Sequence, residues 1–235
     1  MTEKITTVLF DLDGTLLPFD QEEFIHSYFK RLAIKLIPMG FEKDSLMKAI
    51  WTGMEAMTRN DGTKTNEVAF WEVFEGLLHT KRELLEDVFR DFYLNEFDGV
   101  KEVVKESINR KSLIDNLKSK GYQLVLATNP VFPREAVATR LSWINLSLDD
   151  FSYVTTFDNS SYCKPNLGYY ENILKVIGKQ PEECVMIGNN TLEDMVSGKL
   201  GITTGLITTN LENQNNYDVN QFTHGTLEEV VEKLL

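Results

Sequence analysis

The chain has 235 residues, enough for one large domain or for a core with an inserted subdomain. Its hydrophobic content of 42% and charged content of 26% are ordinary for a globular protein. A net charge of −12 argues against nucleic acid as a partner, because binding to nucleic acid depends on clustered Lys and Arg. No run approaches the roughly 18 consecutive apolar residues of a membrane span, so we expect no membrane partner.

The two cysteines and the N-terminal residues bear on the cellular compartment. Cys163 and Cys184 show neither the pairing pattern of a disulfide framework nor the spacing of a metal site. The apolar run near the N-terminus is too short for a signal peptide and ends at Asp11. We therefore expect a cytoplasmic protein with reduced thiols.

The first predicted strand, Ile5 to Phe10, ends in two carboxylates, Asp11 and Asp13. Ligands of open α/β sheets gather at the carboxyl ends of the strands. The two acids have the same parity along an extended chain, so both can face one site. Gly14 then allows a sharp backbone turn. The alternative is that Asp13-Gly14 is simply a hairpin turn, which this dipeptide favours.

Residues 18–98 follow the helical period, and four helices are expected there. Asp20 is a candidate N-cap, and Thr80 to Glu83 matches a capping box that would open the fourth helix. Roughly half of the aromatic residues lie in this region, and we predict that most form the core of a small helical bundle. The apolar faces are Phe24, Tyr28, Leu32 and Leu36; Leu46, Ile50 and Met54; Val68, Trp71, Phe74 and Leu78; and Leu84, Val88 and Phe92.

The rest of the chain alternates between strands and helices. Four further strands are predicted at Tyr122–Ala127, Tyr153–Thr156, Cys184–Ile187 and Thr204–Ile207. Helices are predicted within Val100–Lys120, over Arg134–Ser142, from an Asn166 N-cap to Ile177, after Asp194, and after a Thr226 cap, with residues 209–221 as loop. This alternation predicts an α/β fold, a Rossmann-like parallel sheet with helices on both faces. The core would comprise residues 1–17 and 99–235, with residues 18–98 inserted as an all-helical cap domain.

Polar residues follow three of these strands in turn. Asp11 and Asp13 end the first, while Thr128 and the backbone N–H of Asn129 follow the second. Lys164 precedes a proline at the start of a helix, and Asp194 follows the Cys184–Ile187 strand. This set, in this order, resembles the haloacid dehalogenase superfamily of phosphohydrolases. The resemblance covers nearly the whole chain, and the helical block matches the cap that this family inserts after its first motif.

The resemblance implies a reaction on a small phosphorylated metabolite. Asp11 would be the nucleophile and would form an aspartyl-phosphate, which splits one difficult step into two. Asp13 would act as general acid and then as general base. Thr128, the Asn129 N–H and Lys164 would bind the phosphoryl oxygens, where preorganised donors stabilise developing charge.

The resemblance also implies Mg²⁺, held by Asp11, the backbone carbonyl of Asp13 and Asp194, since this ion prefers oxygen ligands. The fourth motif of the family usually begins Gly-Asp, whereas here Asn189 follows the glycine. Asn189 offers a carbonyl oxygen without charge, so the metal site is expected to be weaker. A register shifted by one would place Asn190 there, which is also neutral.

Two points stay open at this stage. Glu193 could replace the missing charge, but Asn190 to Glu193 resembles a capping box, which would turn Glu193 back toward the helix start. Besides a Mg²⁺-dependent phosphatase, the residues allow a phosphomutase, a haloacid dehalogenase, which would not need Asp13, or a binding or regulatory protein weakened at Asn189.

Overall fold

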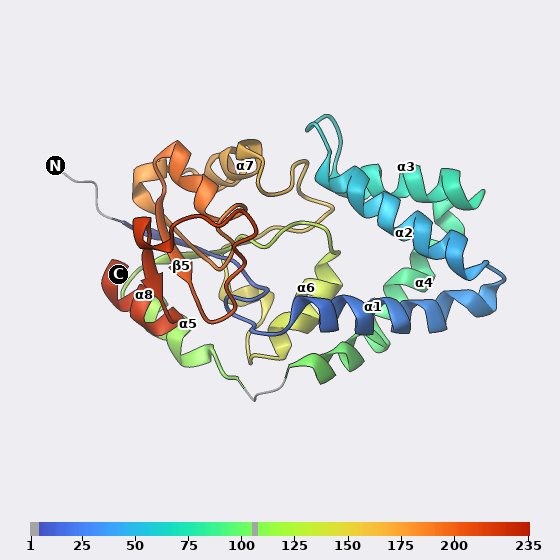
Figure 1. The fold of residues 1–235 in the computed structure, drawn as a ribbon, viewed down its shortest axis with the longest axis horizontal. Helices are drawn as coiled ribbons and strands as arrows, with labels where there is room; N and C mark the ends of the chain where they lie inside the picture. The colour runs from blue at the N-terminus through green and yellow to red at the C-terminus, as the bar shows by residue number, and fades with distance from the viewer. Residues whose placement is uncertain (1–4, 105–107) are drawn as a thin grey trace.

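The fold is built on a parallel sheet, seen in a computed structural model that describes residues 5–104 and 108–235 (Figure 1). Within these residues the strand order is β3-β2-β1-β4-β5-β6, and every neighbouring pair is parallel. The strands are β1 (Thr7–Phe10), β2 (Gln123–Leu126), β3 (Tyr153–Val154), β4 (Cys184–Gly188), β5 (Thr203–Ile207) and β6 (Thr223–Gly225). The central position of β1 places its carboxyl end between those of β2 and β4.

Helices cover both faces of the sheet, because side chains alternate along each strand. Leu9 of β1 packs on one face with Tyr169 and Ile173 of α7. Its neighbours Val8 and Phe10 belong to the core on the other face, which α5, α6 and α8 cover. The helices of this part are α5 (Lys111–Ser119), α6 (Arg134–Ser142), α7 (Leu167–Ile177) and α8 (Leu227–Leu234), with 3₁₀ segments η3 (Leu148–Asp150), η4 (Pro181–Glu183), η5 (Met195–Leu200) and η6 (Val219–Gln221).

The α/β fold class predicted from the sequence is confirmed. The predicted five strands are present, and Asn166 and Thr226 cap α7 and α8 as expected. Two predictions were wrong in detail: the segment after Asp194 is the 3₁₀ helix η5, and the short edge strand β6 was missed. The expected charged helices within Val100–Lys120 are α5 and the end of η2 (Phe97–Val103), and residues 105–107 lie outside the described residues.

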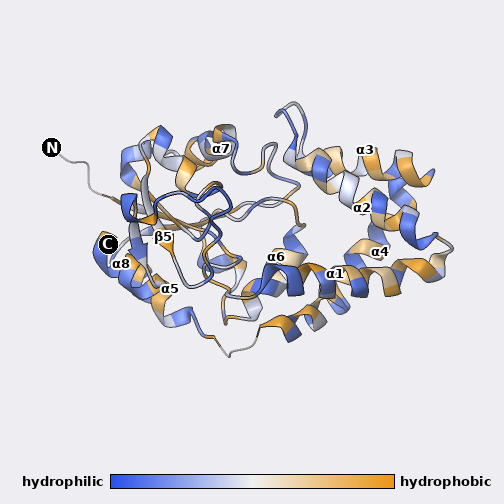
Figure 2. Ribbon diagram, viewed as in Figure 1, coloured by the Kyte–Doolittle hydropathy of each residue, from blue (hydrophilic) through white to orange (hydrophobic). Residues whose placement is uncertain are grey.

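Four helices between β1 and η2 form a group beside the sheet, which we call the helical block (Figure 1). Hydrophobic and hydrophilic residues alternate along them, as Figure 2 shows for α1. Most aromatic residues of the block are buried, and the rings of α1, α3 and α4 pack against one another, as the amphipathic spacing predicted. The block comprises α1 (Gln21–Leu36), α2 (Lys43–Thr58), α3 (Asn66–Leu78) and α4 (Arg82–Asn95), with η1 (Ile37–Met39) after α1.

The fourth helix departs from its prediction. Leu84 is 68% exposed, and the buried stripe is instead Leu85, Phe89 and Phe92 with Tyr93. Lys81 is the N-cap residue and makes no side-chain cap, so the predicted capping box does not form. The carboxylate of Glu75 accepts the hydrogen bond from the Arg82 N–H instead. A contact from α3 therefore replaces the local cap.

Hydrogen bonds at the start of α3 connect the helical block to the sheet domain. The Asn66 N–H donates to the Ser160 carbonyl at 2.8 Å, and the Glu67 N–H donates to the Phe157 carbonyl at 2.9 Å. The Asn66 side chain also donates to the Pro130 carbonyl, just beyond the end of β2. None of the helices in the described residues combines the length and apolar character needed to cross a membrane.

Candidate active site

Asp11 is held where β1 ends. Its N–H donates to the Ile187 carbonyl of β4, and its carboxylate accepts hydrogen bonds from Lys164 Nζ at 2.8 Å and Thr15 Oγ1 at 3.1 Å. Gly14 is required in the following turn, because its φ is +81° and a Cβ would lie 2.2 Å from the Asn189 side chain. The hairpin alternative is excluded, since β1 pairs in parallel with both of its neighbours.

Lys164 bridges two carboxylates in the interior. Its Nζ lies 2.8 Å from Asp11 Oδ1 and 2.7 Å from Asp194 Oδ1. Burial alone would lower the lysine pKa, but the charges of Asp11 and Asp194 raise it well above its usual value, so the ammonium stays charged. Burial raises the pKa of Asp194 to about 6 against the opposing effect of Lys164. Gly188 makes room for this acid, because a Cβ there would lie 2.1 Å from Asp194 Oδ2.

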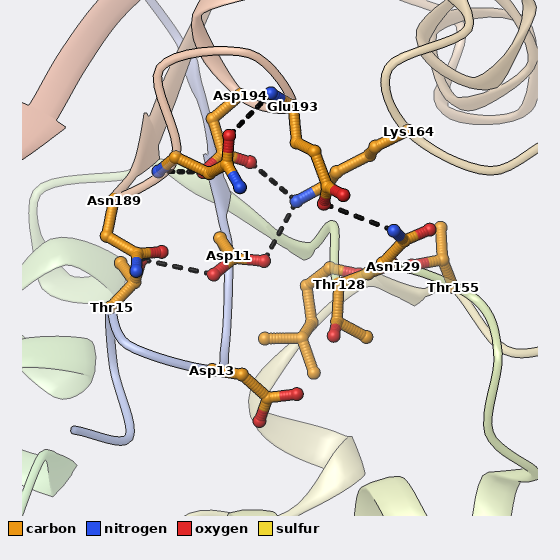
Figure 3. A network of polar contacts seen from close by, with 12 residues as sticks. Asp11, Asp13, Thr15, Thr128, Asn129, Thr155, Lys164, Asn189, Glu193 and Asp194 are labelled. Carbon is orange, nitrogen blue, oxygen red and sulfur yellow. Dashed lines mark hydrogen bonds and ion pairs between the residues drawn. The ribbon is translucent and has the colours of Figure 1, made fainter. Parts of the chain in front are cut away.

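Asp13 pairs with Arg140, which the sequence analysis did not single out. Arg140 Nη1 of α6 donates to Asp13 Oδ2, and the fully buried guanidinium lies 4.5 Å from the centre of the Phe132 ring. Figure 3 shows Asp13 set apart from the group around Asp11. Burial raises the Asp13 pKa, and Arg140 opposes that rise. Within the described residues, Asp13 Oδ1 and Arg140 Nη2 have no hydrogen-bond partner.

A sequence signal for Arg140 did exist. Arg140 shares the buried face of α6 with Ala136, Val137 and Leu141. An arginine within an apolar face needs a buried partner, because an unpaired buried charge is costly. That position could therefore have predicted a carboxylate opposite it.

Thr128 and Asn129 lie where β2 ends, next to Asp11 (Figure 3). The Thr128 carbonyl accepts hydrogen bonds from Thr155 Oγ1 at 2.6 Å and from the Tyr169 hydroxyl at 2.9 Å, which fixes this turn. Across the described parts of the chain, the Thr128 hydroxyl and the Asn129 backbone N–H have no partner. Both donors are therefore available to a ligand.

Glu193 differs from its expected role. The Asn190 side chain does accept the N–H groups of Leu192 and Glu193, as in a capping box. The Glu193 carboxylate, however, accepts a hydrogen bond from the Asn129 side chain at 3.1 Å, and the Asn190 N–H donates to Asp194 instead. Glu193 thus faces the site, and burial raises its pKa to about 7.

Asn189 is buried and oriented by two hydrogen bonds. Its side-chain oxygen accepts from Thr15 Oγ1 at 3.1 Å, and its amide nitrogen donates to the Asn210 carbonyl at 2.7 Å. The same Thr15 hydroxyl contacts Asp11, so oxygens of Asn189 and Asp11 lie close together. The described residues contain no group of three or more His, Cys, Asp or Glu placed to hold a metal. Oxygen ligands of this kind suit a divalent cation, with water and substrate to complete the ligand shell.

The structure brings most of the predicted site residues to one cavity of about 160 Å³. Lys164 is not part of the cavity lining, but its ammonium group donates hydrogen bonds to two of the lining acids, Asp11 and Asp194. Two carboxylates and free donors thus meet at one cavity, and a fixed cation is hydrogen-bonded to its lining acids, an arrangement that would suit cleavage of a phosphate ester. The predicted residues in the lining are Asp11, Asp13, Thr128, Asn129, Asn189 and Asp194.

A family model and a curated relative match most of this chain. The model of the haloacid dehalogenase-like hydrolase family matches residues 5–201. Pyrophosphatase PpaX of Bacillus cereus (strain AH820) is 28% identical over 198 residues, which cover 83% of this chain and 79% of that protein.

Two solved structures share the fold. The HAD phosphatase from Thermococcus onnurineus has a TM-score of 0.59 at 22% identity, covering 98% of both chains. The HAD-hydrolase YfnB from Bacillus subtilis, solved bound to magnesium, has a TM-score of 0.58 at 20% identity, covering 99% of both chains. At these identities the likeness concerns the fold alone.

Proposed function

This chain belongs to the haloacid dehalogenase-like hydrolases, and on that premise we propose that it is a phosphohydrolase of small phosphorylated metabolites that works through an aspartyl-phosphate on Asp11. One observation carries the proposal. The Asp11 carboxylate lies at the cavity, held by Lys164 and Thr15, beside the free donors of Thr128 and Asn129. Each carboxylate oxygen accepts more than one hydrogen bond, so these contacts leave Asp11 able to attack.

The reaction takes two steps. An Asp11 oxygen attacks phosphorus while the ester oxygen leaves with the proton of Asp13, which gives an acyl phosphate and an alcohol. Asp13, now ionised, accepts a proton from water as the water attacks the acyl phosphate, and this releases phosphate and restores both acids. Burial shifts the pKa of Asp13 upward, which is the direction that a general acid needs.

Charge on the phosphoryl group is balanced by groups fixed in advance. Lys164 supplies a cation that two carboxylates keep charged. The Thr128 hydroxyl and the Asn129 N–H would donate to the phosphoryl oxygens, and preorganised donors of this kind need no rearrangement in the transition state.

Oxygen ligands for Mg²⁺ would come from Asp11, the Asp13 backbone carbonyl, Asp194 and Asn189. When bound, the ion would neutralise phosphoryl charge and orient the substrate. YfnB, which shares this fold, was solved bound to magnesium, which makes this ion the first one to test. Residues 18–98 would form the cap over a core of residues 1–17 and 99–235; the helical block lies within this cap, and the second bound falls inside η2.

A panel of phosphorylated metabolites, assayed with Mg²⁺ for release of inorganic phosphate, tests the proposal. We expect hydrolysis of at least one ester, with one phosphate released per alcohol formed. Transfer of the phosphoryl group to another hydroxyl without free phosphate would indicate a phosphomutase. Binding of esters without turnover in Mg²⁺ would favour a regulatory protein and contradict the proposal.

A further inference from the structure

A second cavity of about 330 Å³ lies between the helical block and the segment before α6. Ile50, Met54 and Met57 of α2 line it, as do Phe70 and Trp71 of α3. Cavities of this size and apolar character are typical of small-molecule sites. We call it the outer cavity.

The outer cavity adjoins the candidate active site. Tyr28, Met54, Val131 and Phe132 line both cavities. A phosphate ester held at Asp11 would therefore extend its organic group past these four side chains into the outer cavity. The organic group, and not the phosphate, would meet the helical block.

The charges around the two cavities disfavour a second anionic group. The charged residues that line the outer cavity are four acids, Glu67, Glu86, Glu135 and Asp158, and two arginines, Arg90 and Arg134, so acids outnumber cations there. The cavity of about 160 Å³ at Asp11, which we call the inner cavity, has no Lys or Arg in its lining among the described residues, but it does have the acids Glu193 and Glu212 beside the catalytic aspartates. Arg140 and Lys164 are already paired with these aspartates. A second phosphoryl group next to the first would face carboxylates, so pyrophosphate suits this site poorly.

Besides its charged residues, the outer cavity has one pair of uncharged hydroxyl groups in its lining. The hydroxyls of Tyr28 and Tyr93 are 2.8 Å apart, and both residues line the outer cavity. Burial raises the pKa of Tyr28 to about 12, so the hydroxyl stays protonated. Two hydroxyls joined by one hydrogen bond retain one further hydrogen, which can meet one acceptor on a ligand.

We propose that the outer cavity binds the organic group of the substrate, and that this group is uncharged and mainly apolar, with an aromatic ring as the best fit. The inference rests on the proposed phosphohydrolase function and gives its substrate class. Apolar walls stabilise a ring by removing its surface from water. Because Arg140 and Lys164 are already paired with aspartates, selection among phosphate esters would depend on the apolar side chains of the outer cavity.

Benzyl phosphate and methyl phosphate test this inference, because both release primary alcohols but only one carries a ring. We expect the native protein, with Mg²⁺, to show a kcat/KM roughly 10- to 100-fold higher for benzyl phosphate, as burial of one aromatic side chain would give. Equal values, or faster hydrolysis of pyrophosphate or phosphoethanolamine, would overturn the proposal.

Two matched variants of α2 locate the effect. Met54→Trp fills the wall that the two cavities share and should bring the benzyl-to-methyl ratio toward one. Met47→Trp, two helical turns earlier and also half-buried, lines an outer groove of α1 and α2 and should leave the ratio unchanged. The same loss in both variants would contradict the assignment to the outer cavity.

Binding separates this inference from the proposed reaction. Benzylphosphonate and methylphosphonate cannot be hydrolysed, and calorimetric titration of the native protein with each, in Mg²⁺, measures the ring preference alone. Tighter binding of benzylphosphonate without turnover of any ester would contradict the phosphohydrolase and support the cavity. Turnover of esters together with equal affinities for the two phosphonates would support the phosphohydrolase and contradict the proposed role of the outer cavity.

Discussion

The candidate site and the helical block are held together by different forces. At the carboxyl ends of the central strands, Lys164 and Asp11 each make at least two hydrogen bonds or ion pairs with fixed partners. In the block, the rings of Phe70, Trp71, Phe74 and Phe89 pack against one another, with ring-centre distances of 5.3 to 6.4 Å. Hydrogen bonds to charges are directional, whereas apolar contacts are shared among many atoms. Single substitutions in the candidate site should therefore lower the reaction rate most, and those in the helical block should change substrate preference most.

Asp11→Asn should have the largest effect. An amide cannot form the acyl phosphate, so phosphate release should fall by roughly 10⁴-fold or more. The fold should remain, and thermal unfolding of the variant checks this. Asp87→Asn, a change to an exposed acid on α4, is the control and should keep full activity. Normal turnover by Asp11→Asn would contradict the proposed nucleophile.

Asp13→Asn should cost roughly 10²- to 10⁴-fold, because it removes both proton transfers and leaves Asp11 able to attack. Aryl phosphates, which release good leaving groups, should lose less activity than alkyl phosphates. Steady-state rates on both series measure the difference. Equal losses would mean that Asp13 has another role.

Arg140→Met should show the same leaving-group pattern at a smaller size, up to about 10²-fold, because it acts by releasing the Asp13 carboxylate from its position. Loss of activity that is equal for aryl and alkyl esters would indicate damage to the fold only.

Asn189→Asp should tighten Mg²⁺ by roughly 10-fold, about 1.4 kcal/mol, because it adds a negative charge close to Asp11. It should also weaken phosphate binding in the presence of a chelator. Calorimetric titrations with Mg²⁺ and with phosphate measure both effects. Unchanged Mg²⁺ affinity would place residue 189 away from the metal. The variant loses the hydrogen bond to the Asn210 carbonyl, so its thermal stability should also fall.

Asp150→Asn tests a buried carboxylate outside the site and should change stability alone. Burial would raise the Asp150 pKa, but hydrogen bonds from Lys111 and Lys118 lower it below its usual value. Asp150 therefore stabilises the fold above its unfolded pKa of about 3.9, and this contribution is lost as the pH falls toward the lower folded value. At pH 7 the variant should lose roughly 1–2 kcal/mol of unfolding free energy, since both lysines are partly exposed.

Denaturant unfolding of the native protein and Asp150→Asn at pH 7 and at about pH 3 measures this difference. The difference in unfolding free energy between the two proteins should be smaller at the lower pH. A difference that does not change with pH would contradict a stabilising role of the ion pairs of Asp150. Phosphate release at pH 7 should be the same for both proteins.

The predictable part of the molecule is the part that local pattern controls. Buried strands and the parity of Asp11 and Asp13 predicted the sheet and the position of the first acids. Two apolar stripes at the same spacing compete on α4, and the sequence could not show that Leu85 and Phe89 would be buried in place of Leu84 and Val88. The short edge strand β6 has only half-buried residues and so gave no clear pattern.

Contacts between distant residues explain the remaining differences. Glu193 faces the site because Asn129, which lies 64 residues earlier, donates to it, and a local capping pattern cannot contain that information. Arg140 meets Asp13 across 127 residues. Both pairs depend on the sheet order, which places the ends of β1, β2 and β4 together.

Covalent labelling of Asp11 tests the central claim most directly. The native protein and Asp13→Asn would be mixed with a hydrolysed phosphate ester and Mg²⁺, quenched in acid, and digested for mass spectrometry. With an aryl phosphate, whose leaving group needs little protonation, we predict one added phosphoryl group on the peptide that contains Asp11, with more of it in Asp13→Asn because the water-activating base is missing. Turnover with no phosphoryl group on this peptide, or with the group on another residue, would contradict the account.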